Sequence, residues 1–110
     1  GYDYYDLFRS NGKIHIKGNN GVSLATGLNY YLKYYCNVNI SQVGDQVTMP
    51  KSIIPVEETV HKETKFPVRY SYNYCTLSYS MAFWGEEEWR NELDWLVCSL
   101  FFRVTAEWCR

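Results

Sequence analysis

The sequence predicts an α+β domain, a small antiparallel sheet with a helix, followed by a strand–helix unit of the kind that builds parallel α/β sheets and barrels. Three observations lead to this prediction. Asn11-Gly12 separates two strand-like runs, and an apolar pattern with a helical period follows from residue 21. A second strand-like run, residues 69–77, then leads through a short turn into another helical pattern.

The first element is a β-hairpin. Asn-Gly is the dipeptide most typical of a tight hairpin turn, because both residues readily adopt the positive φ angles that the turn requires. On the second strand Ile14 and Ile16 share one face, whereas Lys13, His15 and Lys17 share the other. His15 is therefore expected to be a solvated strand histidine rather than a ligand or an acid–base group.

A helix is predicted from Gly21 to about Tyr35. The glycine-rich loop before it, residues 18–21, has neither of the common phosphate-binding spacings, so we interpret it as structural, with Asn20 capping the helix. One stripe of the helix is apolar and is expected to pack on the hairpin. Its members are Val22, Ala25, Leu28, Leu32 and Tyr35.

A change in composition follows this domain. Two short runs around Gly44-Asp45, VNISQV and QVTMP, predict two more strands. Residues 51–68 carry charges and prolines with little periodicity, which is typical of an extended connection. We therefore predict an N-terminal domain at residues 1–50 and a linker at residues 51–68, within which His61 faces solvent.

The remaining residues, 69–110, predict a buried strand followed by an amphipathic helix. Asn73 and Cys75 lie on one face of that strand, because alternate residues point the same way. Gly85 and three glutamates then mark the start of a helix, where negative charge is favoured. A barrel of such units needs about 250 residues. We therefore expect the chain to be the front of a larger protein.

Composition excludes several classes of function. The net charge of −1 gives no electrostatic argument for a nucleic acid or membrane partner, and no apolar run approaches membrane-spanning length. The four cysteines have no zinc-site spacing, and no metal or cofactor is predicted. Aromatic residues make up 18% of the chain, which fits either core packing or a sugar-binding surface. Asn39-Ile40-Ser41 is an N-glycosylation sequon.

Several runs resemble the front of the alpha-N-acetylglucosaminidases, glycoside hydrolase family 89. They are GNNGVSLATGLNYYLKYYCNVNIS, RYSYNYCTLSYSMAFW and EEEWRNELDW. In that family a small α+β domain precedes a (β/α)8 catalytic barrel, whose first strand resembles R-Y-x-x-N-x-C-T-x-S-Y-S. The pattern is matched in order by Arg69, Tyr70, Asn73, Cys75, Thr76, Ser78, Tyr79 and Ser80. The following helix is similar through Trp84, Trp89, Glu92, Asp94 and Trp95, and it departs at Gly85-Glu86, where an Asp and a further Trp are expected.

The resemblance implies an exo-acting, retaining glycosidase, lysosomal or secreted, that removes terminal α-linked N-acetylglucosamine from glycans such as heparan sulfate. It also implies that Asn73, Cys75 and Tyr79 line the pocket for the terminal sugar, and that the remainder of the barrel is a partner of this chain. The alternative for Asn73 and Cys75 is that both fill the barrel interior.

No catalytic residue is assigned. Retaining hydrolysis uses two carboxylates about 5 Å apart, and in the relatives both come from later barrel strands. Glu86, Glu87 and Glu88 are consecutive helical residues that point in different directions, so the isolated chain is expected to be inactive. After about residue 96 the sequence diverges from the family, as expected of a truncated barrel. The alternative function is a non-catalytic module that binds a glycan or a partner.

Overall fold

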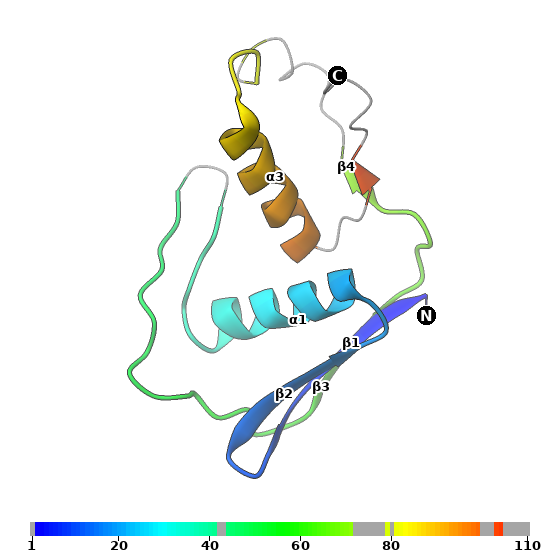
Figure 1. Cartoon of the computed structure of the whole chain (residues 1–110). Helices are drawn as coiled ribbons and strands as arrows, with labels where there is room; N and C mark the ends of the chain where they lie inside the picture. The colour runs from blue at the N-terminus through cyan, green and yellow to red at the C-terminus, as the bar shows by residue number, and fades with distance from the viewer. Residues whose placement is uncertain (1, 42–43, 72–78, 80, 100–102, 105–110) are drawn as a thin grey trace.

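The computed structural model describes residues 2–41, 44–71, 79, 81–99 and 103–104. Figure 1 shows two parts, a sheet with α1 lying on it and a second unit in which α3 stands beside β4. No helix among the described residues is long and apolar enough to span a membrane. In chain order the elements are β1 (Asp3–Ser10), β2 (Lys13–Gly18), α1 (Gly21–Tyr34), β3 (Val60–Thr64), β4 (Tyr70–Ser71), α3 (Glu86–Cys98) and β5 (Arg103–Val104).

The predicted hairpin is confirmed. Asn11 and Gly12 have φ angles of 50° and 73°, the left-handed geometry of a tight hairpin turn, and β1 and β2 pair antiparallel on either side. The isoleucines of β2 turn inward and its lysines outward. His15 is exposed and stacks on the ring of Phe8 at a centroid distance of 5.3 Å, so the prediction of an outward-facing histidine is also confirmed.

The third strand of the sheet was not predicted. The strand order is β2-β1-β3, and β3 pairs antiparallel with β1. Because β3 lies within residues 51–68, the interpretation of this whole stretch as an extended connection is wrong. The two strands predicted around Gly44 are also wrong, since there the described residues form only an isolated bridge between Asn39 and Gln46. Strand β3 is mainly polar and lies at the edge of the sheet. It therefore lacks the alternation of apolar and polar residues by which a strand is identified in a sequence.

Helix α1 is confirmed together with its cap. The Asn20 side chain accepts a hydrogen bond from the Ser23 amide at 2.8 Å, which satisfies one of the free N–H groups of the first turn. The predicted apolar stripe is confirmed only in part. Leu32 and Tyr35 pack against the core, but Leu28 remains 48% exposed. The fully buried residues of the helix are Ser23, Gly27 and Tyr31. Small residues such as Ser23 and Gly27 let the helix approach the sheet closely. A prediction based on the spacing of apolar residues does not identify them as buried.

The core lies between α1 and the sheet. Tyr5 and Leu7 of β1 point toward the helix, and burial raises the pKa of the Tyr5 phenol to about 12. The chain after α1 and the segment before β3 close the sides, where the Tyr31 hydroxyl donates to the Ile54 carbonyl at 2.9 Å. The central cluster consists of Leu7, Tyr31, Cys36, Val38 and Val56.

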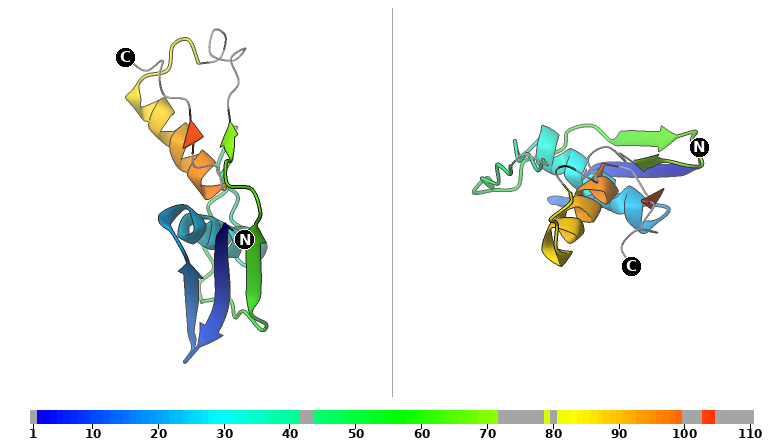
Figure 2. Two further views of the ribbon diagram at one scale, coloured as in Figure 1. Left: turned by 90° about the vertical axis from the view of Figure 1, so that its right-hand side faces the viewer. Right: turned by 90° about the horizontal axis from the view of Figure 1, so that it is seen from above.

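The second unit has the order strand, helix, parallel strand. Strand β4 pairs in parallel with β5, and α3 lies between them in the chain. In the left panel of Figure 2 both strand arrows point away from the three-stranded sheet, while α3 runs back so that its last turn meets α1. The predicted helix after Gly85 is therefore confirmed, and the parallel pair is the connection expected of a parallel α/β architecture.

Candidate functional site

Of the three residues predicted to bind the terminal sugar, Tyr79 is described, whereas Asn73 and Cys75 lie outside the described residues. Tyr79 belongs to the connection from β4 to α3 and is 81% exposed. Phe83 in the same connection is 95% exposed. The described residues of this connection, 79 and 81–85, lie at the end of the unit farthest from the three-stranded sheet (Figure 1). In parallel α/β units, the segment that follows a strand is where active sites form.

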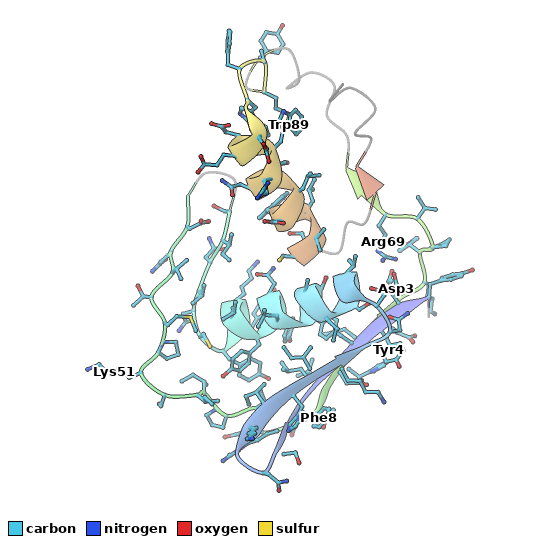
Figure 3. All side chains as sticks on the ribbon, viewed as in Figure 1. Asp3, Tyr4, Phe8, Lys51, Arg69 and Trp89 are labelled. Carbon is cyan, nitrogen blue, oxygen red and sulfur yellow. The ribbon has the colours of Figure 1, made fainter. Side chains whose placement is uncertain are left out.

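The start of α3 is stabilised by its own polar groups. The Gly85 amide donates to Glu88 Oε2 at 2.8 Å, and Arg90 donates to Glu86 Oε1 at 2.6 Å, one helical turn away. Trp84 packs edge-on against Trp89, with ring centroids 5.2 Å apart (Figure 3 labels Trp89). The three glutamates therefore occupy the first turn of a helix, as the sequence predicted, where the helix dipole favours negative charge.

A groove of about 530 Å³ lies between α3 and the loop after α1. Its walls carry flat aromatic rings beside amide and carboxylate groups, the side-chain types that can stack on a sugar ring and hydrogen-bond its hydroxyls. No group of three or more His, Cys, Asp or Glu side chains in the described part of the chain could hold a metal ion. The lining includes Asn29, Asp45, Trp84, Glu88, Asp94 and Trp95.

The junction between the two parts is built around Asp3 and Arg69. Arg69 Nη2 forms an ion pair with Asp3 Oδ2, and Arg69 Nη1 donates to the Phe66 carbonyl at 2.6 Å. The Asp3 side chain is only 17% exposed and that of Arg69 only 10%, and the two lie against each other in Figure 3. The guanidinium of Arg69 lowers the pKa of Asp3 below its usual value.

Two asparagines complete this junction. Asp3 Oδ1 accepts from Asn19 Nδ2 at 3.1 Å and from Asn20 Nδ2 at 2.6 Å. Asn19 Oδ1 in turn accepts from the Tyr4 amide at 3.1 Å and from the Ser23 hydroxyl at 3.0 Å. The glycine-rich loop is therefore structural, as predicted, because its two asparagines tie β1 to the first turn of α1.

A second contact joins α1 to the last turn of α3. Asn29 Nδ2 donates to the Cys98 carbonyl at 3.1 Å. The Thr26 hydroxyl lies 3.4 Å from the Val97 carbonyl but 2.8 Å from the Val22 carbonyl of its own helix, and its single hydrogen favours the nearer acceptor. Asn29 therefore supplies the better contact, to one of the carbonyls that a helix end leaves without an internal partner.

Sequence reasoning missed these junction residues. Arg69 belongs to the strand pattern, but nothing in the sequence links it to Asp3, which lies 66 positions earlier. Asn29 carried no signal either, because an amide in mid-helix has many possible partners. Of the cysteines, Cys36 and Cys98 are free thiols, while Cys75 and Cys109 fall outside the described residues.

The chain matches two sequence families along its length. Residues 1–56 match the family described as "Alpha-N-acetylglucosaminidase (NAGLU) N-terminal domain". Residues 69–100 match the family described as "Alpha-N-acetylglucosaminidase (NAGLU) tim-barrel domain". The human protein named alpha-N-acetylglucosaminidase is 32% identical over 98 residues, which is 88% of this chain and 13% of that protein.

Solved structures of a family 89 glycoside hydrolase from Clostridium perfringens are similar in both sequence and fold. One is a complex with 2-acetamido-1,2-dideoxynojirmycin, and it superimposes with a TM-score of 0.84 at 44% identity over 92% of this chain and 12% of that one. Another, with the same values, is a variant with two glutamates replaced by glutamine, in complex with its substrate GlcNAc-alpha-1,4-galactose. This chain spans about an eighth of the length of these relatives.

The three-stranded sheet with α1 and the parallel unit that follows it therefore correspond to consecutive parts of known relatives. The chain belongs to the alpha-N-acetylglucosaminidase family, glycoside hydrolase family 89, and matches that family's N-terminal domain and the beginning of its barrel domain.

Proposed function

We propose that this chain forms the N-terminal part of a retaining, exo-acting glycosidase that removes terminal α-linked N-acetylglucosamine from glycans such as heparan sulfate. Its two catalytic carboxylates would come from later strands of the same barrel, which makes the remainder of the barrel its partner. The observation that carries the proposal is the TM-score of 0.84 over 92% of the chain to an enzyme bound to 2-acetamido-1,2-dideoxynojirmycin. At 44% identity, such similarity supports shared chemistry as well as a shared fold.

Within that enzyme, Asn73, Cys75 and Tyr79 would line the pocket for the terminal sugar. Strand β4 runs away from the N-terminal sheet, and Asn73 follows its last described residue by two positions. Tyr79 is exposed in the connection beyond the strand, as a ligand-contacting residue must be before a ligand binds. An asparagine amide can both donate to and accept from sugar hydroxyls, which suits Asn73 to this role.

We also propose that the protein is a lysosomal or secreted glycoprotein. The human relative supports this compartment by its name and identity alone. The sequon supports it independently, since Asn39 is exposed in the loop after α1, where a glycan would meet no core residue. The same loop borders the groove against α3.

A chimeric enzyme tests the proposal. Residues 2–99 of this chain would replace the matching segment of the Clostridium perfringens enzyme, and release of N-acetylglucosamine from GlcNAc-alpha-1,4-galactose would be measured. We expect turnover by the chimera and none by the isolated chain. Turnover by the isolated chain would contradict the assignment of the carboxylates to later strands. A folded but inactive chimera would contradict the glycosidase proposal.

The second candidate function, a non-catalytic glycan-binding module, is favoured by one observation. The groove between α3 and the loop after α1 presents Trp84 and Trp95 beside polar side chains. Titration of the isolated chain with GlcNAc-alpha-1,4-galactose, followed by tryptophan fluorescence, separates the two functions. Saturable quenching that a W95A variant abolishes would favour the binding module.

A further inference from the structure

We propose that the N-terminal domain clamps the first strand–helix unit of the barrel at the end opposite the sugar pocket, and that Asp3, Arg69 and Asn29 are positioning residues. The clamp itself rests on the contacts of the described residues. Its effect on sugar binding rests on the proposed function.

The direction of the elements places the clamp at one end of the unit. Strand β4 begins beside the N-terminal domain and points away from it, whereas α3 returns and ends against α1 (Figures 1 and 2). The beginning of a strand and the end of the helix that follows it lie on the same face of a βα unit. In barrels this face carries stability, while the opposite face carries the active site.

The first fixed point is the ion pair of Asp3 and Arg69. Arg69 directly precedes β4, and its planar guanidinium contacts two acceptors, the Asp3 carboxylate and the Phe66 carbonyl. Asp3 is held in turn, because it pairs with Thr64 of β3 and its carboxylate accepts from two asparagines. A largely buried, multiply bonded ion pair holds its geometry far better than an exposed one.

The second fixed point is the contact from Asn29 to the Cys98 carbonyl. Helix α1 also packs directly against α3, and Leu96 in the last turn of α3 is 3% exposed. A single anchor would leave the unit free to pivot about the residues around Arg69. Two anchors, one just before the strand and one at the end of the helix, fix the position of the unit and leave only rotation about the line that joins them. The packing of α1 against α3 opposes this remaining rotation.

This fixation has a consequence for the sugar pocket. A strand that slips by one residue turns all its side chains to the opposite face. In the proposed enzyme the first barrel strand would continue beyond Ser71. Asn73 and Cys75, four and six positions after Arg69, would then share a face that the anchored residue defines. By holding Arg69, the N-terminal domain would set which residues of the first barrel strand face the sugar.

Amide hydrogen exchange of the full chain tests the clamp. We expect D3N to speed hydrogen exchange at the β4 amides of Tyr70 and Ser71 by about tenfold or more. Local opening of β4 costs less free energy when no ion pair has to be broken. Exchange within the β1–β2 hairpin should be unchanged. The matched control is D6N. Asp6 lies on the same strand as Asp3, but its carboxylate contacts His61 of β3, so D6N should leave exchange at the β4 amides unchanged.

Further variants separate positioning from general stability. R69K keeps the positive charge but loses the planar guanidinium that contacts two acceptors. The β4 exchange rate of R69K should therefore lie between the rates of the unsubstituted chain and of R69M. N29A should speed exchange in the last turn of α3 and leave β4 less affected than D3N does. If D3N and D6N speed β4 exchange equally, or if D3N speeds exchange throughout the sheet, the clamp is overturned.

The chimeric enzyme connects the clamp to catalysis. There D3N should raise KM for GlcNAc-alpha-1,4-galactose by about tenfold, with a smaller change in kcat, and D6N should change neither. An unsubstituted chimera without turnover would contradict the proposed function, while the exchange measurement would still decide the clamp. An active chimera whose KM is unchanged by D3N would contradict the positioning role.

Discussion

Gly27 of α1 lies directly against Ile16 of β2. A Cβ atom added at Gly27 would stand 2.7 Å from Ile16 Cγ2, closer than carbon atoms tolerate, and would also crowd the Tyr5 ring at 3.2 Å. The absence of a side chain at this one position lets the helix rest on the sheet. The distance between helix and sheet in turn places Asn20 and Asn29, at the two junctions with neighbouring elements, within reach of their partners.

The first prediction concerns this close approach. We expect G27A to lower the free energy of unfolding by about 1–3 kcal/mol, because overpacking outweighs the gain in helix propensity of about 1 kcal/mol. Urea unfolding followed by circular dichroism measures the change. G21A is the matched control, since an added Cβ there meets no atom within 4 Å, and it should be neutral or slightly stabilising. Equal effects of the two substitutions would contradict the close-packing argument.

The second prediction separates the two roles of Asn20. N20A should lower the free energy of unfolding by about 1 kcal/mol or more, because it removes both the helix cap and the hydrogen bond to Asp3. N20S retains a capping oxygen and loses only the reach to Asp3, so it should cost less than N20A. Thermal unfolding of both variants gives the comparison. A serine variant as unstable as the alanine variant would show that the cap contributes little.

The third prediction concerns acid stability. The pKa of Asp3 is lowered in the folded chain, chiefly by its hydrogen bond with Arg69, so the carboxylate is favoured by folding. Its contribution to stability is present above its unfolded pKa of 3.8 and is lost as the pH falls through the lowered, folded value. Urea midpoints between about pH 2.5 and 6 should therefore change less for D3N than for the unsubstituted chain.

A double-mutant cycle checks the cause of this acid dependence. In an R69M background, D3N should change the midpoints less in the same pH range, because the largest cause of the lowered pKa is already absent and only the hydrogen bonds from Asn19 and Asn20 remain. If D3N has the same effect in both backgrounds, Arg69 is not the source of the lowered pKa.

The fourth prediction concerns Asn39. Expressed through a eukaryotic secretory pathway, the chain should carry a glycan there, so treatment with an amidase that removes N-glycans should increase its electrophoretic mobility. N39Q and S41A should both abolish the shift, because each destroys the sequon. N37Q, two positions earlier, is the control and should leave the shift intact. A shift that survives N39Q would place the modification elsewhere.

The fifth prediction compares two exposed aromatic residues of one connection. In the chimeric enzyme, Y79A should raise KM for GlcNAc-alpha-1,4-galactose by about tenfold or more, because the ring and hydroxyl would contact the terminal sugar. F83A removes an even more exposed ring from the same connection and should change KM little. Equal effects of Y79A and F83A would point to a disturbed connection rather than a lost sugar contact.

The parts of the fold that the sequence predicted depend on local chemistry. Asn11-Gly12 specifies its turn because both residues tolerate positive φ, and Asn20 specifies the start of α1 because its side chain reaches an amide three residues later. The start of α3 follows from Gly85 and the glutamates of its first turn. Each of these signals acts within a few residues of the chain and is therefore visible in a short window of sequence.

The sequence prediction of the candidate site is different in kind. It rests on a family pattern that begins at Arg69 and includes Asn73, Cys75 and Tyr79. Of these three residues, the structure describes the position of Tyr79 alone. The residues that join the two parts of the chain were not predicted. Asp3 and Asn29 resemble ordinary polar residues of a strand and a helix until their partners are known.

By itself the sequence determined the family, the hairpin, both helices and the order of strand and helix after the first domain, but not the parallel partner strand β5. Only the tertiary structure decided that β3 completes the sheet, that Gly27 rather than Leu28 faces it, and that Arg69 meets Asp3. The physical reason is the distance along the chain. Strands and charges pair with whichever segments lie beside them after folding. Composition and periodicity describe only short stretches of the chain and do not predict which distant segments become neighbours.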